Sequence, residues 1–414
     1  MQKGYWFMKK KDRLFKRAYR LYKHGCFDYD GMFSVESLLS SVQVCSQGVM
    51  WKDSTRSFKA RRQLECARLH RELVEGSYQK IPAWHFKLNE RGKQRDISAV
   101  SFRDRVVQRS LCDSSLVPVL SSSLIYDNYA SLPGKGTSLA RSRFERFLRN
   151  SLASYADPYL LVFDWHDYFG TIPAHRVFQA IGAEYRRLEL ALLRRGILPQ
   201  PENALLHVGD FLSILGKFVL EEGEAMGLGN QTSQTVAIWW PNRLDQECSK
   251  LGHYGRYMDD GYCFCRDKAT ADEALRLVTK MSNELGLTLN TSKTHVLPVR
   301  RANMSFLKRV YRATGATKCT DQRVKGPAAV GSALLGIPRS TSYSVRAVSK
   351  SVRWHAGNIS RVLSQYDGVH VTYKTIEAMV AATRNVYGDY DIVYDTLMDR
   401  YGFLVKSAGI QYQL

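Results

Sequence analysis

Two adjacent aspartates, Asp259 and Asp260, are the residues of this chain best suited to chemistry. They lie in the segment RYMDDGYCFC, residues 256–265, where aromatic and apolar residues flank the acids. This composition predicts a strand, a turn and a second strand, with the acids at the tip of the hairpin. Adjacent carboxylates repel each other and need a cation or a basic partner, and their hard oxygen atoms suit Mg2+. An isolated Asp-Asp pair also occurs in ordinary acidic turns, so the rest of the chain decides between these interpretations.

A second acid follows a strand elsewhere in the chain. Leu160 to Phe163 form a continuous apolar run typical of a buried central strand, and Asp164 comes directly after it. If the two segments are neighbours in one sheet, Asp164, Asp259 and Asp260 converge. Three such carboxylates could hold two Mg2+ ions about 3.5 to 4 Å apart, which activate a 3′ hydroxyl and stabilise a leaving pyrophosphate. That is the chemistry of a nucleotidyl transferase.

Further segments strengthen this interpretation by their order and spacing. They are Lys93–Ile97, Phe102–Gln108, Gly229–Gln234, Gly286–Thr294 and Ser305–Lys308. Together with Asp164 and the box Tyr257-Met258-Asp259-Asp260, they resemble the motifs of reverse transcriptases of the prokaryotic single-chain type. The resemblance spans residues from roughly 78 to 311, and the ordered set is far more specific than any one motif.

The resemblance implies a fold and a division into domains. The fold would be an α+β right-hand polymerase, with fingers, a palm built on an antiparallel sheet and a helical thumb. We expect a basic helical region over residues 1–75, fingers and palm over residues 76–310, and a mainly helical thumb over residues 311–414. The spacing of apolar residues near the N-terminus independently predicts amphipathic helices.

The resemblance also assigns roles to individual residues. The catalytic and metal-binding residues would be Asp164, Asp259 and Asp260, holding two Mg2+ ions with Mn2+ as an alternative ion. The dNTP-binding residues would be Lys93, Arg95, Phe169, Leu228 and Lys293. The template and primer contacts would be Gly229, Asn230, Gln231, Ser233, Gln234 and Tyr257.

Several of these roles have a physical basis and a structural alternative. The planar guanidinium of Arg95 can bind phosphate oxygens bidentately, although a solvated hairpin tip is the alternative. Phe169 would exclude a ribose 2′ hydroxyl by bulk, and its alternative is a core ring. Lys293 would protonate the leaving pyrophosphate, unless it is an ordinary surface lysine. Asp104 and Arg105 are expected to form a structural ion pair and helix cap.

The motif that ends with Gly229–Gln234 departs from the common family pattern. Many members of the family carry Pro-Gln-Gly in this motif, and this chain has Leu228 at the position of the glutamine. The ending Gly-Asn-x-Thr-Ser-Gln resembles diversity-generating retroelement enzymes and defence-associated or unclassified bacterial reverse transcriptases. Loss of that polar contact predicts relaxed base selection.

Composition agrees with a nucleic-acid partner. The 414 residues include 60 Lys and Arg against 39 Asp and Glu, a net charge of +21. This excess favours a polyanion, although an anionic membrane surface could also attract it. The eight cysteines show no Cys-x-x-Cys spacing, so no zinc site and reduced thiols are expected. No apolar stretch reaches about 18 residues and no signal peptide is evident, which predicts a cytoplasmic protein without a membrane partner.

The sequence therefore predicts an RNA-directed DNA polymerase whose partners are an RNA template, dNTPs and a DNA product. The template would be a dedicated noncoding RNA in antiphage defence. A diversity-generating or retron-like retroelement enzyme is the alternative role. A noncatalytic RNA-binding protein on a polymerase fold is the alternative of another class, and the oligomeric state is left open.

Overall fold

The computed structural model describes residues 2–47, 49–50, 52–90, 93–199, 208–220, 226, 230–307 and 309–313. The chain divides into two compact units. Unit one comprises residues 1–45, 57–86 and 97–320, and unit two comprises residues 46–56, 87–96 and 321–414. Of the predicted thumb, only residues 311–313 fall within the described residues.

The described part of the first 75 residues is mainly helical, as the apolar spacing predicts. Its helices are α1 (Gln2–Lys23), α2 (Tyr29–Met32), α3 (Val35–Cys45), α4 (Asp53–Ala60) and α5 (Arg62–Val74). α1 packs along α10 (Ala174–Leu193), with Ala18 and Leu21 buried. Arg17 of α1 forms an ion pair with Glu184 of α10. The amphipathic N-terminal helix is thus held against α10 by an apolar face and an ion pair.

A hairpin and a helix follow. β1 (Trp84–Glu90) and β2 (Lys93–Ala99) pair as a two-stranded sheet. α6 (Phe102–Leu111) begins after Ser101, whose hydroxyl accepts a hydrogen bond from the Asp104 N–H at 3.1 Å. A π-helical turn, Cys112–Leu116, then leads into α7 (Val117–Ser121), and α8 (Thr137–Ser154) follows a loop.

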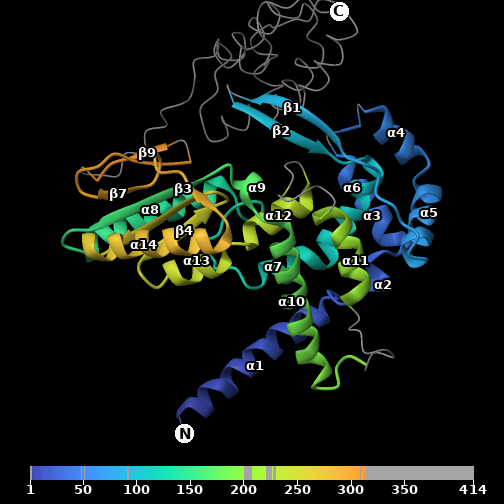
Figure 1. The fold of residues 1–414 in the computed structure, drawn as a ribbon, viewed down its shortest axis with the longest axis horizontal. Coiled ribbons are helices and arrows are strands. Elements are labelled where there is room, and N and C mark those ends of the chain that lie inside the picture. Colours follow the sequence, from blue (N-terminus) through green and yellow to red (C-terminus); the bar gives the residue numbers. More distant parts are fainter. Residues whose placement is uncertain are drawn as a thin grey trace, which may run out of the picture. The chain divides into compact units, whose positions relative to one another are not determined.

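Unit one contains a five-stranded antiparallel sheet (Figure 1). Its strands are β3 (Tyr159–His166), β4 (His253–Tyr257), β5 (Asp260–Cys265), β6 (Thr288–Leu289) and β7 (His295–Pro298). The strand order is β4-β5-β3-β6, and β7 pairs with the first half of β3. β3 is therefore the central strand that its apolar run predicts, although it continues two residues beyond Asp164.

The two faces of the sheet bury different side chains, because successive residues of a strand point to opposite sides. One face contributes Leu161, Phe163 and Cys263 to a core that includes residues of α14 (Lys268–Leu285). The other face contributes Leu160 and Tyr262 to a second core. That second core also contains residues of α8 and of the hairpin formed by β8 (Met304–Phe306) and β9 (Arg309–Tyr311).

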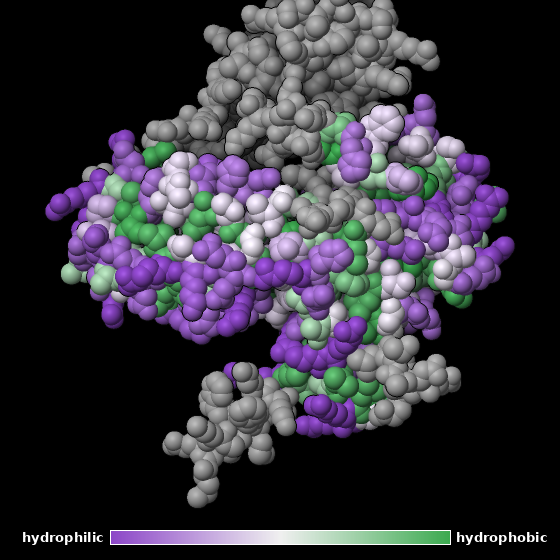
Figure 2. Space-filling view, in the orientation of Figure 1, coloured by the Kyte–Doolittle hydropathy of each residue, from purple (hydrophilic) through white to green (hydrophobic). Residues whose placement is uncertain are grey.

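The remaining helices are α9 (Tyr168–Thr171), α11 (Val208–Val219), α12 (Gln231–Trp239) and α13 (Asn242–Cys248). In Figure 2, hydrophilic side chains cover most of the surface over α13 and α14, as expected for helices with one buried face. Within the described residues, no helix is long and apolar enough to cross a membrane.

Candidate active site

The structure brings the two predicted acidic segments together on neighbouring strands. β3 and β5 pair antiparallel, and Asp164 lies directly opposite Asp260. Directly opposed residues point to the same face of a sheet, so the two carboxylates face the same side. The next pair is Phe163 and Gly261, and a Cβ on Gly261 would lie 2.1 Å from Phe163 Cζ. A glycine therefore follows Asp260 because the Phe163 ring occupies the space of a side chain.

The two adjacent aspartates have different positions in the hairpin. Tyr257 pairs with Asp260 across it, which leaves Met258 and Asp259 as a two-residue loop. Met258 has a φ of 56°, in the left-handed region. Two-residue hairpin loops of type II′ need a positive φ at the first loop residue and usually have glycine there. Only Asp259 thus lies at the predicted tip, while Asp260 begins β5.

The segment after α14 supplies the neighbours of Asp164. The Lys293 ammonium lies 2.9 Å from Asp164 Oδ2. The Asn290 backbone N–H donates to the Asp164 carbonyl at 2.8 Å, and its side-chain amide lies 3.5 Å from Asp164 Oδ1. Sequence reasoning had not singled out Asn290. An Asn-Thr-Ser run just after a strand is a signal for such a turn, because asparagine side chains accept hydrogen bonds from residues two positions later.

The site is crowded with negative charge. Asp164 is only 5% exposed. Burial, together with the Asp259 and Asp164 carboxylates, raises the pKa of Asp260 to about 7, and the Lys293 ammonium opposes this shift. The hydrogen bond to Asp164 is the main reason that the pKa of Lys293 is raised above its usual value. The described residues thus place one ammonium group beside three carboxylates. A bound cation would neutralise more of this negative charge.

These residues fit a divalent cation. In polymerase sites Mg2+ is bound by one or two carboxylates together with substrate phosphates and water. No group of three His, Cys, Asp or Glu side chains in the described part of the chain is arranged to hold a metal ion alone. Asp164 and Asp260, with Asp259 beside them, are the residues that would hold it, because a cation relieves the repulsion that raises the pKa of Asp260.

Lys293 offers a direct test of how this site works. If its ammonium acts as the general acid for the leaving group, Lys293→Gln should lower the rate of single-nucleotide incorporation by about 100-fold. Rapid-quench primer extension would measure that rate. Lys280→Gln, which changes an exposed lysine on α14, is the matched control and should keep the wild-type rate. An unchanged rate in Lys293→Gln would leave the lysine only a structural role.

The predicted template and primer segment lies at the start of α12. Asn230 and Ser233 are buried, with side-chain atoms that have no hydrogen-bond partner among the described residues. Gln231 and Gln234 line a cavity of about 250 Å³. The other residues that line it are Val44, Cys45, Arg105, Gln108 and Arg109. Sequence reasoning missed these α6 residues as site candidates, although two arginines and a glutamine at positions 105, 108 and 109 share one helix face.

Other predicted site residues are placed less fully. Gly229 and Leu228 lie outside the described residues. Lys93 and Arg95 belong to β2, and their side chains also lie outside what the structure describes. Phe169 is partly buried, its ring 5.8 Å from that of Tyr168.

Tyr257, predicted to contact template or primer, is part of the second core. It packs as a partly buried side chain against this core, which also includes β8 and β9 residues. Burial raises the pKa of its hydroxyl above the usual value. Ser305 to Leu307, from the last of the predicted motif segments, lie in the hairpin of β8 and β9, where the Arg141 guanidinium donates to the Leu307 carbonyl at 2.8 Å.

Comparison with known proteins decides the family. The reverse transcriptase (RNA-dependent DNA polymerase) family matches residues 86–307, more than half of the chain. The chain belongs to the reverse transcriptase family. The predicted enzyme class, an RNA-directed DNA polymerase and hence a nucleotidyltransferase, is confirmed by this membership. Family and antiparallel palm sheet together confirm the predicted right-hand polymerase fold.

Solved structures similar to this reverse transcriptase include two telomerases. Telomerase from Candida albicans, in complex with the TWJ fragment of telomeric RNA, has a TM-score of 0.45 and 11% identity over 80% of this chain and 64% of that chain. Apo telomerase from Candida tropicalis has a TM-score of 0.44 and 11% identity over 79% of this chain and 59% of that one. The reverse transcriptase therefore spans less than two thirds of either telomerase chain. No curated protein sequence matches it.

Proposed function

We propose that this reverse transcriptase is of the prokaryotic single-chain type and copies a dedicated noncoding RNA into DNA in antiphage defence. The observation that carries the reaction is the cross-strand pair of Asp164 and Asp260 with Lys293 beside it. The net charge of +21 supports a nucleic-acid partner. The ending of the segment Gly229–Gln234 supports the defence-associated or unclassified bacterial group. The proposed reverse transcriptase acts in the cytoplasm.

The reaction is attack of a primer 3′ hydroxyl, or of a protein or RNA hydroxyl, on a dNTP. Two Mg2+ ions, when bound, would activate the hydroxyl and stabilise the leaving pyrophosphate. Asp164, Asp259 and Asp260 would hold these ions. Lys293 would give a proton to the pyrophosphate, since its ammonium lies 2.9 Å from Asp164 Oδ2, beside the residues that would hold the ions. Lys93 and Arg95 would bind the triphosphate.

Gln231 and Gln234 would contact the template from the cavity beside α6. Arg105 and Arg109 line the same cavity and would neutralise phosphate charge there. Leu228, in place of the common glutamine, would leave the incoming base with one polar contact fewer. This substitution would relax base selection.

A substitution of Phe169 tests whether this residue selects dNTPs over rNTPs. If its ring excludes the ribose 2′ hydroxyl, Phe169→Val should improve the use of rNTPs relative to dNTPs by about 10- to 100-fold, because the smaller side chain opens the space. Competing dNTP and rNTP incorporation on one RNA template would measure the ratio. A variant as selective as the wild type would assign the ring to the core alone.

The same experiment also tests two rival functions. The Gly-Asn-x-Thr-Ser-Gln ending also resembles diversity-generating retroelement enzymes, which would copy a template repeat for a variable target gene. A noncatalytic RNA-binding protein on a polymerase fold would bind RNA without making DNA. The three aspartates oppose this second rival.

The deciding experiment expresses the protein with its native flanking DNA and sequences the RNA and DNA that co-purify. The control is Asp259→Ala with Asp260→Ala. One discrete noncoding RNA, with complementary DNA only in the wild type, is the result expected of a dedicated-template enzyme. Complementary DNA matching a template repeat would support the retroelement function. The noncatalytic function would be supported by three results together. RNA would co-purify without DNA, the same would hold in phage-infected cells, and the purified protein would not extend a primer.

A further inference from the structure

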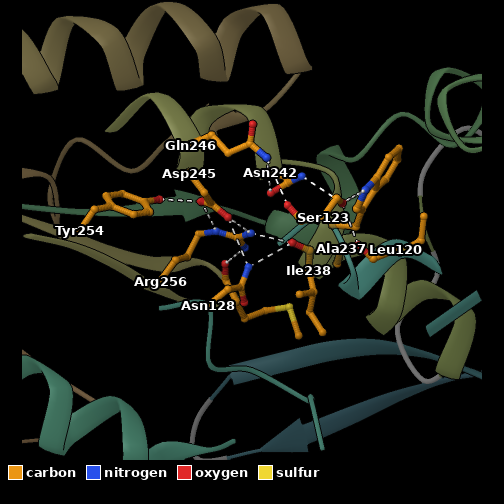
Figure 3. Close-up of polar contacts among 12 residues, drawn as sticks. Leu120, Ser123, Asn128, Ala237, Ile238, Asn242, Asp245, Gln246, Tyr254 and Arg256 are labelled. Atoms are coloured by element: carbon orange, nitrogen blue, oxygen red, sulfur yellow. Dashed lines mark hydrogen bonds and ion pairs between the residues drawn. The ribbon is translucent and has the colours of Figure 1, made fainter. Parts of the chain in front are cut away.

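A buried arginine directly precedes the catalytic box. Arg256 lies in β4, and both it and Asp245 of α13 have fully buried side chains. Arg256 Nε lies 2.7 Å from Asp245 Oδ1, and Nη2 lies 2.7 Å from Oδ2 (Figure 3). A buried ion pair of this kind seldom makes a protein more stable than apolar residues of similar size would. Another role is therefore worth seeking for this pair.

The guanidinium also binds two backbone carbonyls. Its Nη1 donates to the Met258 carbonyl at 2.7 Å. Its Nη2 donates to the Ile238 carbonyl at 2.6 Å. Ile238 belongs to the last turn of α12, where backbone carbonyls lack partners within the helix. One side chain thus contacts both the loop that carries Asp259 and the far end of the helix that begins beside the predicted template contacts.

The hydrogen bond from Arg256 to the Met258 carbonyl holds a residue whose backbone conformation is unfavourable. Met258 has the positive φ that favours glycine. Its carbonyl belongs to the planar peptide unit that it shares with Asp259. A hydrogen bond to that carbonyl therefore fixes the plane from which Asp259 extends. A strained loop of this kind persists only where its surroundings hold it in place.

Other contacts fix the arginine itself. The Tyr254 hydroxyl donates to Asp245 Oδ1 at 2.7 Å, and Asn128 donates to Oδ2 at 3.3 Å (Figure 3). The Arg256 backbone N–H donates to the Asp127 carbonyl at 3.0 Å. The guanidinium carbon also lies 5.9 Å from the ring centre of Trp165, the residue after Asp164. Arg256 thus contacts α12, α13, β3 and the segment that precedes α8.

We propose that Arg256, oriented by Asp245, is a positioning residue that holds the Met258–Asp259 loop so that Asp259 and Asp260 face Asp164. It also ties this loop to the end of α12. The inference rests on the proposed polymerase function, because positioning matters only if these carboxylates bind the metal ions. No part of the predicted site included Arg256 or Asp245.

The test separates positioning from stability. Arg256→Met with Asp245→Leu removes both charges, so no unpaired charge is buried and the double variant should fold. It still lacks the bond to the Met258 carbonyl. We expect a kcat for primer extension about 10- to 100-fold below wild type, with the KM for dNTP little changed. Mn2+ binding to the protein alone, followed by electron paramagnetic resonance, should weaken by a similar factor.

Two single variants complete the design. Tyr254→Phe is the matched control, because it removes one hydrogen bond to Asp245 and leaves the Met258 contact in place. It should keep wild-type kcat and Mn2+ affinity, with a slightly lower unfolding temperature. Arg256→Lys keeps the charge beside Asp245 but cannot reach all of the arginine's acceptors. It should show the same lowered kcat and Mn2+ affinity as the double variant.

The outcomes are distinct. A folded double variant with wild-type kcat and Mn2+ affinity would overturn the inference. If the double variant does not fold, Arg256→Lys decides in the same way, and wild-type values there would also overturn it. A wild-type protein that extends no primer on RNA would count against the proposed function instead, while the Mn2+ measurement would still report on the loop.

Discussion

Asp164→Asn should abolish DNA synthesis, with a loss on the order of 1,000-fold or more in the rate of primer extension. An amide has nearly the shape of the carboxylate but carries no charge. It therefore cannot neutralise a divalent cation or pair with the Lys293 ammonium, which lies 2.9 Å from Asp164 Oδ2. Asp259→Ala should have a similar effect. Extension of a DNA primer on an RNA template, with binding of the same duplex measured in parallel, provides the check.

The loss should be confined to chemistry. Template and primer binding should stay near the wild-type level, because the predicted nucleic-acid contacts lie on other elements. Asp267→Asn is a matched control, since it makes the same chemical change at the cap of α14, where Asp267 accepts from the Thr270 N–H at 2.8 Å. Asparagine caps helices as well as aspartate does, so this control should keep full activity. Synthesis that survives in Asp164→Asn would remove Asp164 from the active site.

Local sequence signals were sufficient to predict the strand and the hairpin that carry the three aspartates. An apolar run followed by Asp164 predicts a buried strand, and an acidic pair between aromatic segments predicts a hairpin. Both signals are read within a few residues. Adjacency of the two strands was a conditional expectation, and the register of β3 and β5 confirms it. The general acid and surface interpretations of Lys293 could not be separated, because its distance to Asp164 depends on how the segment after α14 returns to the sheet.

Other parts of the site depend on tertiary packing and escaped sequence reasoning. Arg256 is one charged residue in a short strand, and nothing local indicates that Asp245 on α13 lies beside it. Asp104 is a second residue whose partners could not be predicted from the sequence. It was expected to pair with Arg105, but Arg103 is the arginine that approaches it, with Nη1 3.6 Å from Oδ1. Two of the donors to Asp104, Tyr78 and Ile81, come from another segment of unit one.

Asp104 should be among the residues most important for stability. Its carboxylate is fully buried and accepts from the Tyr78 hydroxyl at 2.6 Å, the Ser101 hydroxyl at 2.7 Å and the Ile81 N–H at 3.0 Å. These bonds join the start of α6 to the segment that leads into β1. Asp104→Ala would leave three donors without that acceptor, and each buried donor left unsatisfied costs about 1 to 3 kcal/mol.

We therefore expect Asp104→Ala to lower the free energy of unfolding by about 3 to 4 kcal/mol, measured by urea unfolding. Two variants divide this loss. Tyr78→Phe removes one of the three bonds and should cost about 1 kcal/mol. Asp104→Asn keeps one oxygen, which can still accept from Ile81 and Ser101, while the Tyr78 hydroxyl can rotate to accept from the new amide. This variant should recover most of the lost stability.

The comparison of alanine with asparagine decides what Asp104 contributes. If asparagine is nearly as stable as the wild type, hydrogen-bond geometry at the base of the hairpin is what the fold requires. Equal destabilisation in Asp104→Asn and Asp104→Ala would show instead that the charge beside Arg103 is required, and the hydrogen-bond account would be wrong. Because Lys93 and Arg95 of β2 are proposed to bind the dNTP, Asp104→Ala should also raise the KM for dNTP more than Tyr78→Phe does.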